Sequence, residues 1–157
     1  MQKTKLPWDV KQTCIWIVRG YERRVKWYQE ERKEILSGSG TRYDTYEDER
    51  TGESIRQFLP KTAAGRATEQ KTLRLERLER DPEILRMRAV EYAARQVCPD
   101  IQNQELRQRL VGCIRQNCQN GRAYPFEYLN LTEFSRSDFY RRKDQFLYWI
   151  ASFLKLV

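Results

Sequence analysis

The segment from Ser135 to Val157 has polar and basic side chains at helical spacing on one side and aromatic side chains on the other. Successive residues of an α-helix turn by about 100°. The polar side then holds Ser137, Tyr140, Arg141 and Asp144, and the apolar side holds Phe139, Phe146, Ile150 and Phe153. Guanidinium, ammonium and hydroxyl groups are the side chains that contact phosphates and base edges. This pattern predicts a helix that packs through its rings and meets a polyanion through its N-terminal half.

Within this helix we expect two kinds of DNA contact. Arg141 and Ser137 would contact base edges or adjacent phosphates, while Arg136, Arg142 and Lys143 would position the helix on the phosphate backbone. An outward acid suits a DNA interface only where it accepts a hydrogen bond from a cytosine amine. The predicted DNA-binding set is Arg136, Ser137, Tyr140, Arg141, Arg142, Lys143 and Asp144. The alternative interpretation of the basic residues is an ordinary solvated helix face.

The elements around this helix predict a helix-turn-helix over about 124–156. Ser135 at the N-cap, with Asp138 three residues later, is a variant of the capping box and marks the start of the last helix. Tyr124 to Leu129 forms a short helical piece before it. Leu131 and Phe134 are expected to fill the angle between the two, as apolar turn residues do in such motifs.

The chain before this motif divides into three predicted segments. Residues 1–36 form one long amphipathic helix, in which Gly20 is a weak point that costs about 1 kcal/mol against Ala. Residues 37–72 form either an irregular connection or a short hairpin. Such a hairpin would turn at Thr51-Gly52, with alternating Tyr43, Tyr46, Ile55 and Phe58. Residues 73–157 form a helical domain with a new helix at Asp81-Pro82-Glu83, so the predicted class is all-α.

Composition limits the chemistry of the chain. Its net charge is +8 with a pI near 9.5, which mildly favours a polyanionic partner. Histidine is absent and the four cysteines lack CxxC spacing, so we expect no metal ion, cofactor or catalytic site. The cysteines are expected to act as small buried hydrophobes in a reducing cytoplasm. Neither an apolar run of about 20 residues nor a hydrophobic signal segment is present, so no membrane association is expected.

Residues 122–151 resemble the C-terminal segment of ArpU/RinA-type phage transcriptional regulators. The resemblance rests on Ser135-Arg-Ser-x-Phe139-Tyr-Arg-Arg-Lys143 and the aromatic-rich helix that follows, about the last quarter of the chain. It implies a DNA-binding regulator of phage or prophage genes, with a C-terminal helix-turn-helix similar to the promoter-reading domain of sigma factors. RNA polymerase would be a further partner.

Two other functions remain open from sequence. The N-terminal helix carries Trp16 and Trp27 off its main apolar stripe, which permits a homodimer through that helix. The same helices would also suit an adaptor that binds RNA polymerase or a phage packaging component without reading DNA. An enzyme such as a nuclease ranks last, because the carboxylates are interleaved with Arg and Lys, as on salt-bridged helix surfaces.

Overall fold

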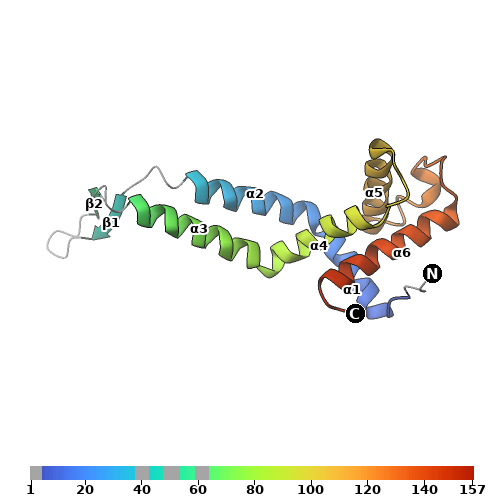
Figure 1. Ribbon diagram of the computed structural model, residues 1–157, viewed down its shortest axis with the longest axis horizontal. Coiled ribbons are helices and arrows are strands. Elements are labelled where there is room, and N and C mark those ends of the chain that lie inside the picture. The colour runs from blue at the N-terminus through green and yellow to red at the C-terminus, as the bar shows by residue number, and fades with distance from the viewer. Residues whose placement is uncertain (1–4, 38–42, 48–53, 59–63) are drawn as a thin grey trace. The chain divides into compact units, whose positions relative to one another are not determined.

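The computed structural model describes residues 5–37, 43–47, 54–58 and 64–157. The regular elements among these residues are helices, apart from one two-stranded hairpin, which confirms the predicted helical class (Figure 1). The chain divides into two compact units. We call residues 1–25 with 82–157 the terminal unit, and residues 26–81 the middle unit.

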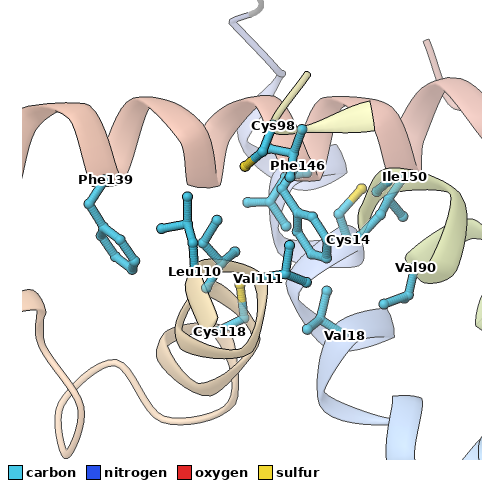
Figure 2. Close-up of a cluster of buried hydrophobic side chains, with 14 of the residues drawn as sticks. Cys14, Val18, Val90, Cys98, Leu110, Val111, Cys118, Phe139, Phe146 and Ile150 are labelled. Atoms are coloured by element: carbon cyan, nitrogen blue, oxygen red, sulfur yellow. The ribbon is translucent and has the colours of Figure 1, made fainter. Parts of the chain in front are cut away.

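The terminal unit is a bundle whose helices meet around one core. Its helices are α1 (Trp8–Arg19), the first turn of α2 (Tyr21–Ser37), α4 (Pro82–Gln96), α5 (Gln104–Gln119) and α6 (Arg136–Phe153). The last helix packs most extensively against α4 and also contacts α1, which in turn contacts α5. Figure 2 shows side chains of these helices, among them Val18, Val90, Leu110 and Phe146, converging between the helices. All these side chains are buried, so one continuous core positions α6.

The predicted long N-terminal helix is interrupted at Gly20, which separates α1 from α2. Helical hydrogen bonds continue on both sides, from the Gly20 amide to the Trp16 carbonyl at 3.2 Å and from the Arg24 amide to the Gly20 carbonyl at 3.0 Å. A Cβ atom at residue 20 would lie 2.5 Å from Nη1 of Arg24. The glycine therefore makes room for a buried arginine, a role that helical periodicity cannot reveal.

Both ends of α4 and both ends of α5 lie at residues that favour helix boundaries. The helix α4 begins at Pro82 and ends at Gln96, before Pro99. The helix α5 begins after Asn103, whose side chain accepts hydrogen bonds from the amides of Glu105 and Leu106. At the other end of α5, the Asn120 amide donates a hydrogen bond to the Gln116 carbonyl. Both helices therefore start and stop at residues with a physical reason to cap them.

The middle unit contains the rest of α2, the strands β1 (Tyr43–Glu47) and β2 (Ser54–Phe58), and α3 (Ala64–Arg80). The strands are antiparallel, with Tyr43 opposite Phe58 and Tyr46 opposite Ile55. Of the two predicted alternatives, the segment thus forms the hairpin; its expected Thr51-Gly52 turn lies outside the described residues.

The third helix starts earlier than predicted, at residue 64 rather than near residue 73. Residues 64–72 lack large apolar side chains, which is why periodicity missed them, but most are good helix formers such as Ala, Arg, Gln and Lys. Ile35 and Leu78 are the buried hydrophobic residues of the middle unit among those described, and the Tyr28 hydroxyl donates to the Glu79 carboxylate. In the part of the chain that the structure describes, no helix is both long and apolar enough to cross a membrane.

Candidate nucleic-acid interface

The helix α6 begins as its sequence predicts. The Ser135 hydroxyl accepts a hydrogen bond from the Asp138 amide at 3.1 Å, so Ser135 is the N-cap. Phe139, Phe146 and Ile150 are completely buried. The predicted apolar stripe therefore does anchor the helix in the core of the terminal unit.

The two halves of α6 differ in their surroundings. Leu147 and Ala151 are buried as well, so the C-terminal half is enclosed more fully than its apolar stripe alone predicts. Phe153 was expected in the core but is 38% exposed and lies against Tyr92, with ring centroids 5.3 Å apart. Such partial exposure is common near the end of a helix. The polar stripe is thus accessible only over the first half of α6.

Four residues of the predicted DNA-binding set lie together on that first half. Ser137 is exposed, and the side chains of Arg136 and Arg141 are 67% and 48% exposed. Tyr140 is half-buried and packs edge-on against Phe139 at 5.3 Å. The Arg136 guanidinium lies 5.7 Å from the centroid of the Tyr140 ring. The result is a cationic surface with an aromatic ring in its middle.

Lys143, a fifth member of the set, also contacts the Tyr140 ring. Its ammonium nitrogen is 5.9 Å from the ring centroid, and the residue is half-buried. Cations over an aromatic face are attracted by the negative potential of the ring, and exposed examples contribute about 0.5–1 kcal/mol. Tyr140 therefore orders the two neighbouring cations Arg136 and Lys143. We call Arg136, Ser137, Tyr140, Arg141 and Lys143 the α6 face.

The exposed arginines of the α6 face form surface ion pairs. Nη1 of Arg136 lies 2.8 Å from Oε1 of Glu127, and Arg141 pairs with Asp138 one turn earlier. Exposed pairs of this kind contribute about 0–1 kcal/mol. A phosphate oxygen can replace either carboxylate at small cost, so these pairs orient the guanidinium groups without blocking them.

Arg142 was predicted to contact phosphate, but the structure places it inside the protein. It is 7% exposed, and its two terminal nitrogens donate to the two carboxylate oxygens of Asp100 at 3.0 and 2.7 Å. Its Nε donates to Asp138 at 3.0 Å, and its guanidinium lies 5.4 Å from the Phe134 ring. The Arg142 hydrogen bonds hold the pKa of Asp100 at about 2. A phosphate contact would require Arg142 to leave two carboxylates, and we therefore exclude it from the α6 face.

Asp144, the acidic member of the predicted set, is also engaged within the protein. Its Oδ1 lies 2.8 Å from the ammonium nitrogen of Lys11 in α1. A base contact through this carboxylate, as the sequence predicted, requires that ion pair to open. The pair closes one side of a cavity of about 580 Å³ beside α6.

The predicted DNA-binding set does not include the residues that line this cavity from the N-terminal side. They are Lys5, Leu6, Pro7, Trp8 and Lys11, and the Trp8 side chain is 76% exposed. Two lysines and an indole beside the α6 face are suited to phosphate and aromatic contacts. No sequence signal could have found them, because Lys11 and Asp144 are separated by 133 positions.

The element before α6 is shorter than predicted. The expected short helical piece at Tyr124–Leu129 is a single 3-10 turn, η3 (Phe126–Tyr128), that begins after Pro125. Asn130 ends it in the left-handed region with φ of 53°. Leu131 is buried and Phe134 half-buried in the turn, as predicted. The motif therefore consists of a 3-10 turn and α6, because the five residues between Pro125 and Leu131 are too few for a capped helix.

The thiols offer no reactive site. Cys14, Cys98 and Cys118 are buried, and all four cysteines are free, as expected for small hydrophobes. Burial raises the pKa of Cys14 and of Cys118 to about 11, which keeps both protonated at neutral pH. Within the described ranges no three His, Cys, Asp or Glu residues cluster as metal ligands would.

The excess charge lies in the terminal unit. It contains eighteen of the thirty basic residues and ten of the twenty-two acidic ones, a net +8, whereas the middle unit has twelve of each. The unit that presents the α6 face therefore carries all of the net charge. No family model, curated protein or solved structure matches the chain. Its function must be inferred from these residues and their geometry.

Proposed function

We propose that the protein is a double-stranded DNA-binding transcriptional regulator of phage or prophage type that contacts DNA through the α6 face. One observation carries the proposal: the first half of a capped helix presents exposed Arg136, Ser137 and Arg141, while the second half is anchored in the core by buried Phe146, Leu147, Ile150 and Ala151. A DNA-reading helix needs both an accessible N-terminal half and a rigid mount. The resemblance of residues 122–151 to ArpU/RinA-type regulators points the same way.

In this proposal each residue has a role set by its surroundings. Arg136 and Lys143 flank the Tyr140 ring and contact phosphates, which fixes the helix on the backbone. Ser137 and Arg141 are exposed beside this ring and reach base edges. Lys5 and Lys11 extend the cationic surface toward α1. Such a regulator would act in the cytoplasm with RNA polymerase, alone or as a homodimer through its N-terminal helices.

A salt-graded binding titration tests the proposal. A fluorescently labelled duplex from upstream of the protein's own gene is titrated with wild type and with the Arg136→Gln/Arg141→Gln variant, and anisotropy is read at several salt concentrations. Removing two cations from the DNA interface should weaken binding about tenfold or more and reduce the slope of log affinity against log salt by about 1–2.

The matched control removes the same charge elsewhere in the terminal unit. Arg23→Gln/Lys155→Gln changes two cations that lie at the start of α2 and after the end of α6. This variant should retain the wild-type salt slope to within about 0.5. Equal losses in both variants would mean that only net charge matters, and no loss in either would favour the adaptor function over DNA binding.

A further inference from the structure

A second basic site lies away from the α6 face, between the C-terminal end of α4 and the first turns of α5. The residues there surround a cavity of about 770 Å³, which we call the α4–α5 groove. Its polar lining residues are Arg95, Gln102, Gln104, Arg107, Gln108 and Arg115. No carboxylate is among the described residues that line it. Three guanidinium groups and three amides without an acid form an environment for an anion.

The arginines of the groove are only partly satisfied by the protein. Arg107 donates through Nη2 to the Ile101 carbonyl, and Nη2 of Arg115 is 3.6 Å from Oε1 of Glu22. The Nε atoms of both arginines are buried and have no hydrogen-bond partner within the protein. Buried donors in native proteins are nearly always paired. Both guanidinium groups therefore keep donors that the protein does not use.

The remaining contacts hold the site open. The Arg115 guanidinium lies 4.4 Å from the centroid of the Tyr21 ring, which supports it from one side. Arg95 is exposed and has no ion-pair partner among the described residues. At Gly112, which also lines the groove, an added Cβ would meet no atom within 4 Å. The groove thus has room beside its cations.

We propose that the α4–α5 groove binds a phosphate-bearing ligand, with Arg107 and Arg115 donating to phosphate oxygens and the glutamine amides bonding polar groups attached to that phosphate. The planar guanidinium matches phosphate geometry with two parallel hydrogen bonds. A volume of about 770 Å³ falls in the range of about 300–1,000 Å³ that small-molecule sites occupy. The phosphate belongs either to a free ligand or to a nucleic-acid backbone, and the site does not depend on the function of the α6 face.

Arginine side-chain NMR tests this proposal at the atoms concerned. Protein labelled with ¹⁵N is titrated with inorganic pyrophosphate, against sodium chloride at equal ionic strength, and the Nε–Hε signals are assigned with Arg107→Lys and Arg115→Lys variants. The signals of Arg107 and Arg115 should shift saturably with pyrophosphate and not with chloride. Arg109, on the same helix but paired with Glu133, is the internal control and should not shift.

Two variants measure the affinity itself. Arg107→Gln/Arg115→Gln should weaken pyrophosphate binding at least tenfold, whereas Arg109→Gln should leave it unchanged; circular dichroism confirms that each variant is folded. Arg107→Lys keeps the positive charge but cannot donate two parallel hydrogen bonds, so its affinity for pyrophosphate should lie between those of the two glutamine variants. Shifts that are linear, equal in all arginines or reproduced by chloride would overturn the proposal.

A competition experiment identifies the source of the phosphate and separates this site from the α6 face. The Arg136→Gln/Arg141→Gln variant should bind pyrophosphate as wild type does, and loss of binding in it would contradict a separate site. Displacement of pyrophosphate from this variant by a short duplex would identify a phosphodiester backbone as the ligand. Retention of pyrophosphate would identify a free phosphate compound.

Discussion

The terminal and middle units differ in both charge and core. The terminal unit carries the net +8 and all twenty members of the large buried cluster, whereas the middle unit is neutral and buries Ile35 and Leu78 among its described residues. Charge and rigidity therefore occur in the same part of the chain. A polyanion-binding surface requires both, because cations on a poorly packed support lose their alignment. The proposed binding of a polyanion is therefore expected of the terminal unit.

Large-to-small substitutions in the two cores test this comparison most strongly. Phe146→Ala should lower the free energy of unfolding by about 3–5 kcal/mol, because the ring is completely buried among α1, α4 and α5. Leu78→Ala should lower it by about 2 kcal/mol, at the low end of such changes, because the small core around it can relax. Urea unfolding followed by far-ultraviolet circular dichroism measures both.

The two substitutions should also differ in their effect on DNA binding. Phe146→Ala should abolish DNA binding at urea concentrations where wild type still binds, while Leu78→Ala should retain binding there. If both substitutions cost the same free energy and the same binding, the middle unit would share the core of the terminal unit, and the comparison would fail.

The sequence predicted features that depend on residues close together in the chain and missed features that depend on residues far apart. The buried stripe of α6 and the Ser135 cap depend on residues within a few turns, so periodicity and capping rules found them. The role of Arg142 depends on Asp100, 42 positions away, and was missed. Its second partner, Asp138, lies one turn earlier and was the available signal, since an acid at i−4 favours an internal pair.

The same limit applies to the other missed features. The Gly20 interruption depends on Arg24. Two hydrogen bonds hold this arginine in its buried position, from Nε to Glu83 at 2.7 Å and from Nη1 to the Ile17 carbonyl at 2.6 Å. The α4–α5 groove depends on how two helices pack. Neither arrangement produces a periodic pattern in the sequence from which it could be predicted.

The neighbouring residues Arg141 and Arg142 of α6 should differ in their effects on stability. Arg142→Gln should lower the free energy of unfolding by about 2 kcal/mol, less than the roughly 3–5 kcal/mol of fully buried pairs because the Asp100 side chain is 61% exposed. Arg141→Gln removes an exposed pair and should change stability by no more than about 0.5 kcal/mol.

In DNA binding the order of the two effects should be reversed, with the larger effect in Arg141→Gln. At a temperature where both are folded, Arg141→Gln should weaken duplex binding and lower its salt slope by about 1, whereas Arg142→Gln should retain the wild-type slope. Anisotropy and thermal unfolding on the same samples give both quantities. A lower salt slope in Arg142→Gln would show that its guanidinium reaches phosphate after all.

Substitutions of two glycines, Gly112 in α5 and Gly20 between α1 and α2, should have the smallest effects, and these should have opposite signs. Helix propensity alone predicts that alanine stabilises either position by up to about 1 kcal/mol. Gly112→Ala should do so by about 0.5–1 kcal/mol, because its Cβ meets no atom within 4 Å. Gly20→Ala should instead destabilise by about 1 kcal/mol, because its Cβ would displace the Arg24 guanidinium from Glu83 and the Ile17 carbonyl.

The Gly20 result depends on whether Arg24 can move cheaply. A flexible arginine at the surface would give way, and alanine would then stabilise both positions alike. Arg24 is buried, is held by two hydrogen bonds and lies 5.1 Å from the centroid of the Trp16 ring, so its displacement breaks several contacts together. In the background Arg24→Ala, which removes the obstacle, Gly20→Ala should become stabilising. Thermal unfolding of the four combinations measures this coupling, and simple additivity would show that the guanidinium is not the reason for the glycine.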